Sequence, residues 1–384
     1  MLRKIAIFSL LPLLTMLVIQ AQDQLTGTTG GVTLNIRQRA DPVSERIAQL
    51  PPNTPIIVEA RSEKGDWVLV TAPQPGLRGW VAIGYVSFDR TIRVMEDLPY
   101  SSEQVVNAGA IGSAAGPAPQ AQVAPADIIP DRIDYPPVFL NDGVWRNIRQ
   151  IYGRGRQLGN DPWALMKVGE SNTAGTVYLC NFEWRSYALG DHSQLQQVVD
   201  EFSRTGSFCR NNASAQNGFG TVNVLDPLFA LPEFCQPDET PLACEVRRSR
   251  PSFAFIHIGL ADTGVITAQQ YNSNLTQIVR YLSSSGVIPI LQTWPTADVF
   301  NANNRPQLFN EEIRKVAYAN NVPLLDIRAA IYGYENHGTE SDGHHLSVRN
   351  PTVSDLGDAN TYGRPYRELQ SLQILYDLIA GLNS

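Results

Sequence analysis

The chain has 384 residues, of which 43% are hydrophobic and 17% are charged, and this length suggests two folded domains. Its formal net charge of −7 gives no basic surface for a nucleic acid, and a mildly acidic balance commonly serves solubility. Composition and charge therefore favour a globular two-domain protein and argue against nucleic acid as a partner.

The first 21 residues are typical of a signal peptide. Two basic residues precede an apolar run over residues 5–19, and Ala21 offers a small residue for cleavage. An uncleaved membrane anchor is the alternative, but the run is shorter than the roughly 20 residues that a spanning helix needs, and Pro12 interrupts it. We therefore expect residues 1–21 to be removed and the protein to be extracellular or associated with the cell envelope.

Residues 28–90 are expected to form a small all-β module. Strand-like runs separated by turn signals lie at residues 32–37, 55–60, 67–71 and 79–86. The segments LNIRQRAD, EKGDWVLV and GLRGWVAIGYV resemble those of bacterial Src-homology-3-like domains. The resemblance implies a small, partly open barrel, and such domains often bind cell-wall peptides or glycans. Trp67 and Trp80 either line a ligand groove or belong to the core of a domain too small for many other aromatic side chains.

Residues 99–136 are expected to be a flexible linker. Ala, Gly, Pro, Gln and Ser dominate this stretch, which has few large apolar residues and cannot build a core. The two domains are therefore expected to move independently.

Residues 137–384 show alternating strands and helices. Short apolar strands are expected at residues 164–169, 252–259, 287–293 and 322–327. Helices are expected at residues 143–157, 269–286, 307–321 and 367–382. This alternation predicts an α/β domain whose parallel sheet is covered by helices on both faces.

Four cysteines lie in the second half of the chain: Cys180, Cys209, Cys235 and Cys244. An even number in an exported protein predicts disulfides, and the spacing does not match a tetrahedral zinc site. Three pairings are possible. The pairing of Cys235 with Cys244 closes a short loop that holds two prolines, and it would leave Cys180 to pair with Cys209.

Polar residues with catalytic potential follow the expected strands. In parallel sheets, active sites lie beyond the carboxyl ends of the strands, and Ser171 follows the first strand directly. A serine hydroxyl needs a base within hydrogen-bond distance, and the base needs an orienting carboxylate. Asp342 and His345 are three residues apart, so one turn can hold both. Taken singly, such a serine is more often a helix cap, and the Asp-Gly-His-His segment a loop or an adventitious metal site.

Together and in this order, the motifs around Ser171, Asp262 and His345 resemble those of SGNH (Gly-Asp-Ser-Leu-like) hydrolases, over residues 165–350. The resemblance implies a flavodoxin-like three-layer α/β/α fold and hydrolysis of ester bonds in acylated carbohydrates or lipids, without a metal or organic cofactor. It implies that Ser171 is the nucleophile, His345 the general base, and Asp342 the residue that orients the base.

The resemblance also implies an oxyanion hole. The backbone N–H of Ser171 would donate one hydrogen bond, and Gly218 or Gly220 would supply another. The residues that match the supporting motifs are Gly169, Glu170, Gly259 and Asp262. In the family motif, Asp262 is a structural carboxylate that does not react. His257 lies within a buried strand and is expected to be a core histidine whose hydrogen bonds are satisfied.

Two positions depart from the family pattern. Glu170 stands where the family has aspartate, and Ala261 replaces an asparagine whose amide donates to the oxyanion. Losing one such donor costs about 2.7–4 kcal/mol of transition-state stabilisation. The candidate substitutes for it are the side-chain amides of Asn172, Asn181 and Asn212. The sequence therefore leaves two main functions open: an esterase or deacylase, and a non-catalytic envelope-binding protein on a hydrolase scaffold. A peptidase that uses the same three residues is a third reading, which rests on the mechanism alone.

Overall fold

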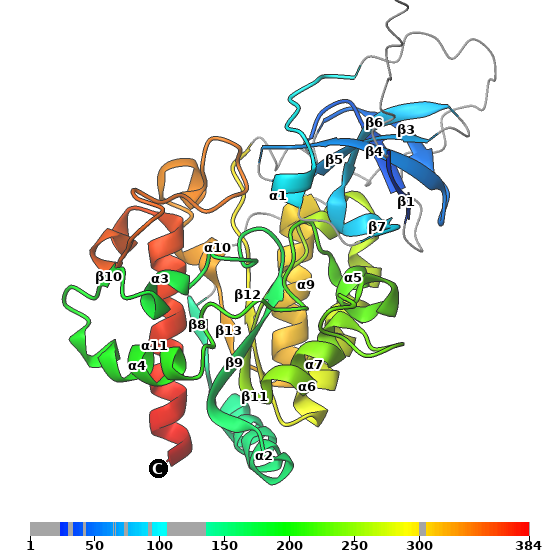
Figure 1. The fold of residues 1–384 in the computed structure, drawn as a ribbon. Coiled ribbons are helices and arrows are strands. Elements are labelled where there is room, and N and C mark those ends of the chain that lie inside the picture. Colours follow the sequence, from blue (N-terminus) through cyan, green and yellow to red (C-terminus); the bar gives the residue numbers. More distant parts are fainter. Residues whose placement is uncertain are drawn as a thin grey trace, which may run out of the picture.

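The computed structural model describes residues 24–29, 34–40, 44–63, 65, 67–72, 76–90, 94–105, 136–298 and 305–383. The expected signal peptide, residues 1–21, and residues 106–135 of the expected linker lie outside the described residues. The described chain forms a β-barrel and an α/β domain, and the barrel lies against one end of the α/β domain (Figure 1).

The N-terminal barrel is built from seven strands in the order β3-β2-β6-β5-β4-β1-β7, with every neighbouring pair antiparallel. The strands are β1 (Leu25–Thr29), β2 (Leu34–Arg37), β3 (Arg46–Leu50), β4 (Pro55–Arg61), β5 (Trp67–Ala72), β6 (Leu77–Ala82) and β7 (Val86–Phe88). Buried and partly exposed residues alternate along β4, as a strand with one face in a core requires. The sequence did not predict β1 and β3, whose residues are too polar to show a clear apolar alternation.

The barrel extends past the residue at which the sequence predicts its end. Helix α1 (Val94–Asp97) follows β7. The Arg61 N–H then donates to Pro99 O at 2.9 Å, and the Val105 N–H donates to Gln38 O at 2.9 Å. Residues 99–105, which the sequence assigned to the linker, therefore lie along the barrel and are held by backbone hydrogen bonds.

The sheet of the α/β domain has five strands in the order β8-β13-β12-β11-β9. They are β8 (Val138–Phe139), β9 (Asp161–Gly169), β11 (Pro251–His257), β12 (Ile288–Gln292) and β13 (Leu324–Leu325). The four strands expected from the sequence are all present and parallel to one another. The edge strand β8 runs antiparallel to β13 and was not predicted, because two residues are too few to show a period.

Helices cover both faces of this sheet. The α-helices are α2 (Asp142–Leu158), α3 (Cys180–Glu183), α4 (Gln196–Arg204), α5 (Thr221–Leu225), α6 (Pro241–Ser249), α7 (Ala268–Ser284), α9 (Arg305–Asn320), α10 (Ile327–Ala330) and α11 (Gly363–Asn383). The short 3₁₀ helices are η1 (Ile83–Tyr85), η3 (Ser193–Leu195), η4 (Pro227–Phe229), η5 (Ala261–Gly264), η6 (Glu335–Gly338) and η7 (Leu356–Asn360). Strands β10 (Tyr187–Ala188) and β14 (Ser354–Asp355) form a separate two-stranded sheet.

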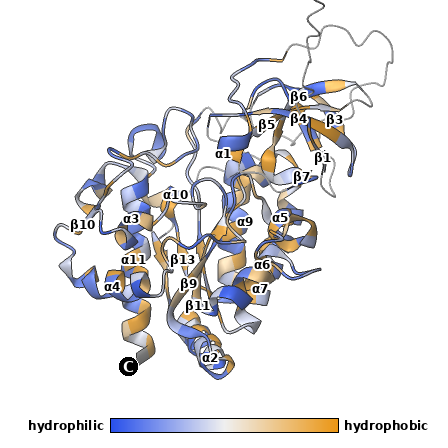
Figure 2. Cartoon of the chain, viewed as in Figure 1, coloured by the Kyte–Doolittle hydropathy of each residue, from blue (hydrophilic) through white to orange (hydrophobic). Residues whose placement is uncertain are grey.

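Two hydrophobic cores lie on opposite faces of the five-stranded sheet. Along β11, Phe253 and Phe255 belong to the core beneath α2, α4 and α11, whereas Ala254 and Ile256 belong to the core beneath α7 and α9. Hydrophobic residues gather on the strands and on the helix sides that face them (Figure 2). The expected three-layer α/β arrangement with an N-terminal all-β barrel is confirmed. No described helix is long and apolar enough to cross a membrane.

The structure contains two disulfides, Cys180–Cys209 and Cys235–Cys244, which is the pairing favoured from the sequence. The first joins the start of α3 to the segment after α4. The second joins the loop before α6 to α6 itself. Each disulfide therefore links a loop residue to a helix residue.

Removing the longer disulfide should cost more stability than removing the shorter one. The loop closed by Cys180–Cys209 spans 29 residues and that closed by Cys235–Cys244 spans 9. Because the loss of unfolded-state entropy grows with loop length, we expect the Cys180→Ala/Cys209→Ala variant to lose about 3.5 kcal/mol of unfolding free energy, and the Cys235→Ala/Cys244→Ala variant about 2.5 kcal/mol. Urea denaturation measures both, and the reverse order would contradict the expectation.

Candidate active site

The candidate site begins where β9 ends. The Gly169 N–H donates to Ser214 O at 3.1 Å, which pairs the end of the strand with the segment beside it. A Cβ at Gly169 would lie 2.6 Å from His257 O, so only glycine fits between the two strands. The chain then enters a tight turn over residues 170–175, named here the nucleophile turn. Ser171 therefore lies at the carboxyl end of the sheet, as the sequence predicts.

The structure brings Ser171, His345 and Asp342 together. His345 Nε2 lies 2.8 Å from Ser171 Oγ, and His345 Nδ1 lies 2.8 Å from Asp342 Oδ2. Asp342 Oδ1 also accepts the backbone N–H groups of His344 and His345, at 3.1 and 3.0 Å. These bonds close a second turn over residues 342–346, named here the histidine turn. The three side chains thus have the order and spacing that a nucleophile, a base and an orienting acid require.

Side chains that the sequence did not single out as positioning groups hold the two turns together. Asn172 Nδ2 donates to His344 O at 2.9 Å, and Asn172 Oδ1 accepts the Leu346 N–H at 2.8 Å. From α11, the buried Arg367 donates to Asn172 O at 2.6 Å and to Thr173 Oγ1 at 3.0 Å. These bonds fix the nucleophile turn against the histidine turn. A lone arginine in a helix carries no sequence signal for such a role.

Of the two glycines considered for the oxyanion hole, only Gly218 lies at the site. Gly218 lines a small pocket together with Ser171 and Ala261. Its φ of 73° is in the left-handed region, where glycine is favoured. Gly220 is instead the N-cap of α5, and a Cβ there would lie 2.4 Å from Asp262 Oδ1. The backbone of Gly218 is therefore the better partner for the Ser171 N–H.

None of the three asparagines considered as substitutes for the missing amide at Ala261 is placed to fill that role. None of the three lines the small pocket, and the side-chain amide of each donates to a backbone carbonyl. These bonds are Asn172 to His344 O at 2.9 Å, Asn181 to Pro351 O at 3.4 Å, and Asn212 to Arg210 O at 2.7 Å. The oxyanion hole therefore has no asparagine donor among the candidates predicted from the sequence.

Glu170 lies beside the nucleophile as a buried carboxyl group. Its side chain accepts the Leu260 N–H at 3.0 Å and lines the same small pocket as Ser171. Burial raises the pKa of Glu170 to about 8, although the hydrogen bond from Leu260 opposes the shift. At neutral pH the carboxyl group therefore keeps its proton, so no full negative charge lies beside the position where an oxyanion would form.

Asp262 supports the surrounding structure, as the family pattern implies. It accepts the Thr221 N–H at 2.8 Å and the Thr221 hydroxyl at 3.2 Å, which holds the start of α5. The buried hydroxyl of Tyr85, from the barrel, donates to Asp262 Oδ1 at 3.4 Å. Burial raises the pKa of Asp262 to about 7.

The barrel contacts the α/β domain at the site itself. Asn35, on β2, donates through its side chain to Gly264 O. The backbones at Gly84 and Gly218 approach so closely that a Cβ at Gly84 would lie 2.0 Å from Gly218 O. The barrel lies at this end of the α/β domain in Figure 1. This contact corrects the expectation that the two domains move independently.

Two barrel residues complete the wall of the small pocket. Trp67 and Ala82 line a pocket of about 30 Å³ together with Ser171 and Ala261. Ala261 also packs against the hydrophobic core of the barrel. The position at which the family has asparagine is thus where the barrel docks. Trp67 and Trp80 are both buried in the barrel core, and of the two only Trp67 also lines this pocket.

Two further histidines lie near the site. His257 is buried, and neither of its ring nitrogens has a hydrogen-bond partner, so the expectation that its bonds are satisfied is wrong. Burial lowers the pKa of His257 well below its usual range, which keeps the ring neutral. His344 packs on His345 with ring centroids 4.2 Å apart. The ligand atoms of His344, His345 and Asp342 lie within 4.8 Å of one another, so a metal ion bound there would compete with the His345–Asp342 hydrogen bond.

Residues 32–87 match the family model of the bacterial SH3 domain. No curated protein matches the chain. Among solved structures, the chain is similar to the lipase/acylhydrolase from Enterococcus faecalis, with 20% identity over 56% of this chain and 94% of that one, and a TM-score of 0.37. A GDSL-like lipase from Bacteroides thetaiotaomicron shows 14% identity over 61% and 99%, with a TM-score of 0.36. A catalytic mutant of an acetylxylan esterase from Geobacillus stearothermophilus shows 14% identity over 55% and 93%, with a TM-score of 0.38.

If the site hydrolyses esters, its activity should fall as Glu170 loses its proton. Above about pH 8 the Glu170 carboxylate would repel a developing oxyanion. We expect Glu170→Gln, which stays neutral and can still accept the Leu260 N–H, to retain activity at pH 9 where the unsubstituted protein declines. The pH dependence of kcat/KM measures this, and a parallel decline in both proteins would contradict it.

The same group makes stability depend on pH. The folded chain holds the Glu170 proton up to about pH 8, whereas the unfolded chain loses it near the usual value of 4.5. Between these two pH values the folded state binds more protons than the unfolded state. The contribution of Glu170 to the unfolding free energy therefore falls as the pH rises from about 4.5 to about 8. We expect the stability of Glu170→Gln relative to the unsubstituted protein to be higher at pH 8 than at pH 5 in urea denaturation.

Proposed function

We propose that the chain is a serine hydrolase that cleaves carboxylic ester bonds. The observation that carries this proposal is the continuous hydrogen-bonded path from Ser171 through His345 to Asp342, with both distances at 2.8 Å. The path lies at the carboxyl end of a parallel sheet, beside a pocket that Gly218 lines. A lone helix-capping serine would not need either feature.

The geometry supports a two-step mechanism. His345 Nε2 takes the proton of Ser171 Oγ as that oxygen attacks the ester carbonyl, and the protonated ring then gives the proton to the leaving alcohol. Water, deprotonated by His345, hydrolyses the acyl-serine and releases the acid. Asp342 accepts a hydrogen bond from His345 Nδ1–H, which keeps Nε2 free to act as the base. The backbone N–H groups of Ser171 and Gly218 would bind the oxyanion.

The replacement of asparagine by Ala261 limits the rate. With one donor fewer, the transition state loses stabilisation equivalent to about a hundredfold to a thousandfold in kcat. The protonated Glu170 prevents a further loss at neutral pH, because it places no charge beside the oxyanion. We therefore propose a slow esterase or deacylase.

The substrate and location are proposed on the sequence signals. Residues 1–21 would direct export, and the chain would act outside the cell or at its envelope. Acylated carbohydrates or lipids are the proposed substrates, and the barrel is of a class that binds cell-wall ligands. Trp67 faces the catalytic pocket, so this tryptophan would contact a substrate in that pocket if it takes part in binding.

A non-catalytic envelope-binding protein is the second candidate. Two observations favour it: Ala261 contributes no amide to the oxyanion hole, and the pocket at Ser171 is only about 30 Å³. In that case the hydrogen-bonded path would be a remnant of the scaffold. An assay for an activated serine separates the two functions.

Replacing Ser171 with alanine should abolish ester hydrolysis. Without a nucleophile, turnover of p-nitrophenyl acetate should drop to the background rate, a loss of about 10³-fold or more. Ser273, an exposed serine on α7 that bonds to its own helix, provides the matched control as Ser273→Ala. A fluorophosphonate probe should label the unsubstituted protein at Ser171. Unchanged turnover in Ser171→Ala would contradict the esterase, and absence of both turnover and labelling would favour the binding protein.

Replacing Asp342 with asparagine should impair the base without removing it. Because the amide can favour the wrong tautomer of His345, we expect kcat to fall by about 10⁴-fold at neutral pH. A stopped or continuous p-nitrophenyl acetate assay measures the loss. A decrease of less than about tenfold would show that Asp342 does not orient the base.

A further inference from the structure

Glu170 brings a polar side chain to the place where the oxyanion hole lacks a donor. It lines the small pocket together with Ser171, Gly218 and Ala261. The Leu260 N–H donates to Glu170 Oε1 at 3.0 Å, so the carboxyl group is held at the residue next to Ala261. Glutamate has one methylene more than the aspartate of the family motif, which extends its reach. The carboxyl group therefore lies beside the position of the missing amide.

The surroundings of this carboxyl group favour its neutral form. Glu170 is only 5% exposed, and burial raises its pKa to about 8, although backbone hydrogen bonds oppose the shift. The nearby charge of Asp262 also favours the neutral form, whereas that of His344 favours the carboxylate. Two further ionisable neighbours, Tyr85 from the barrel and Tyr271 from α7, stay uncharged because burial raises the pKa of each hydroxyl well above its usual range. At neutral pH the group is therefore a carboxylic acid.

A buried carboxylic acid has a hydroxyl that needs an acceptor. Within the described residues, the hydrogen bonds of the Glu170 side chain are all bonds that it accepts from backbone N–H groups. An oxyanion formed at Ser171 would be an acceptor in the same pocket, and an acid kept neutral by burial can donate to an oxyanion. Trp67 and Ala82 of the barrel line this pocket, and a hydrogen bond is stronger where water is excluded.

We propose that the carboxyl group of Glu170 is an oxyanion donor of the candidate site and takes the part that an asparagine at position 261 would play. Its O–H donates to the carbonyl oxygen of the ester as that oxygen becomes negative during attack by Ser171. The proton stays on Glu170, and the backbone N–H groups of Ser171 and Gly218 donate to the same oxygen. The proposal rests on the proposed function, and it adds a catalytic residue that restores part of the lost stabilisation at neutral pH.

Two neutral replacements separate hydrogen-bond donation from the mere absence of charge. Glu170→Gln keeps an N–H donor and an acceptor for the Leu260 N–H, whereas Glu170→Met has neither. With p-nitrophenyl acetate at pH 7, we expect Glu170→Met to lower kcat by about 100-fold or more with KM changed by less than about threefold, because the oxyanion exists only in the transition state. Glu170→Gln should stay within about tenfold of the unsubstituted protein. Equal kcat values for the two variants would overturn the proposal.

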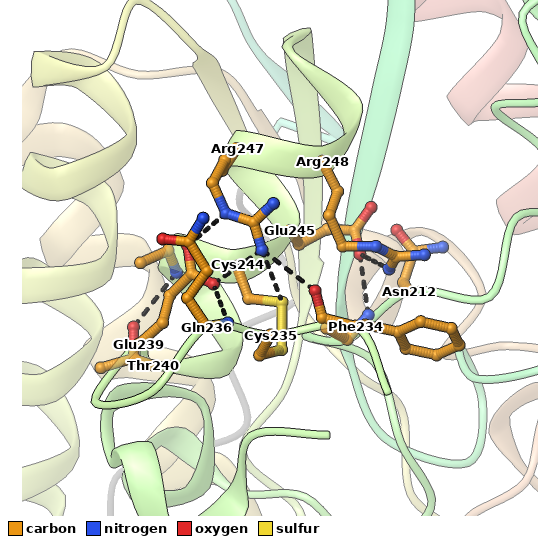
Figure 3. Close-up of a disulfide and its surroundings, with 12 residues drawn as sticks. Asn212, Phe234, Cys235, Gln236, Glu239, Thr240, Cys244, Glu245, Arg247 and Arg248 are labelled. Atoms are coloured by element: carbon orange, nitrogen blue, oxygen red, sulfur yellow. Dashed lines mark hydrogen bonds and ion pairs between the residues drawn. A yellow bond between two sulfur atoms is a disulfide. The ribbon is translucent and has the colours of Figure 1, made fainter. Parts of the chain in front are cut away.

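Glu245→Met is the matched control. The buried carboxyl group of Glu245, on α6, accepts the Ala213 N–H at 2.8 Å, close to the second disulfide (Figure 3). Burial raises the pKa of Glu245 as well, but this residue does not line the small pocket. The control also removes a buried carboxyl group that accepts a backbone N–H, and it should leave kcat within about twofold. A loss as large as that in Glu170→Met would contradict a specific role for Glu170.

Acetate binding tests the donor without catalysis. The Ser171→Ala protein keeps the backbone N–H of residue 171 and has no nucleophile, and acetate presents a negatively charged oxygen. In titrations of ¹³C-labelled acetate followed by NMR at pH 7, we expect Glu170→Met in this background to weaken binding about tenfold or more, and Glu170→Gln less than about threefold. Acetate affinity of the Ser171→Ala protein should fall above about pH 8, where Glu170 loses its proton.

Infrared difference spectroscopy tests the same hydrogen bond with Glu170 in place, so it does not depend on the folding of Glu170→Met. Addition of acetate to the Ser171→Ala protein should shift the C=O stretch of a protonated carboxyl group. The shifted band should be absent when Glu170→Gln is added to this background. A spectrum without such a shift would overturn the donor assignment.

The two assays distinguish failure of the donor from failure of the catalytic assignment. If the unsubstituted protein hydrolyses no ester but acetate binding depends on Glu170 as expected, the esterase fails and the donor stands. If p-nitrophenyl acetate is hydrolysed but Glu170→Met changes neither kcat nor acetate affinity, the donor fails and the esterase stands. Equal acetate affinity in the two Glu170 variants overturns the donor in either case.

Discussion

The hydrogen bond between His345 and Ser171 joins two turns that lie 174 residues apart in the chain, and the site depends on keeping them in contact. The parallel sheet brings the nucleophile turn to its carboxyl edge, but the sheet alone does not set a 2.8 Å distance. Asn172 bonds to the histidine turn through both atoms of its amide, and Arg367 bonds to the nucleophile turn from α11. The reacting groups are therefore supported by buried polar contacts, which have fixed geometry.

The barrel also shapes the walls of the candidate site. Ala261 packs on the barrel core, and Trp67 lines the pocket at Ser171. A larger asparagine at position 261 would have to share this space, so the docked barrel offers a physical reason for the small residue there. The gain is a site enclosed by two domains, and the loss is one oxyanion donor. The neutral state of Glu170 is consistent with this enclosure, because burial is what holds its proton.

Local patterns predicted the parts of the fold that repeat along the chain. The four parallel strands and the helices between them show clear apolar periods. Of the candidate catalytic residues, Ser171 follows a strand, and Asp342 and His345 share a turn. The role of Arg367 could not be predicted, because its partners at residues 172 and 173 lie 195 and 194 positions away. The contact between the barrel and the site could not be predicted either, because its partners are also far apart in the sequence. The composition of the linker describes the segment between the domains and carries no information on the surfaces that meet.

A second domain that only tethers an enzyme should leave the active site complete without it. Here the barrel provides Trp67 to the wall of the pocket at Ser171, and Tyr85 donates to the buried Asp262. Asp262 in turn holds the start of α5, just after the loop of Gly218. The barrel is thus linked to both the walls and the support of the site. The walls of the pocket at Ser171 thus come from both domains, whereas Ser171, His345 and Asp342 all belong to the α/β domain.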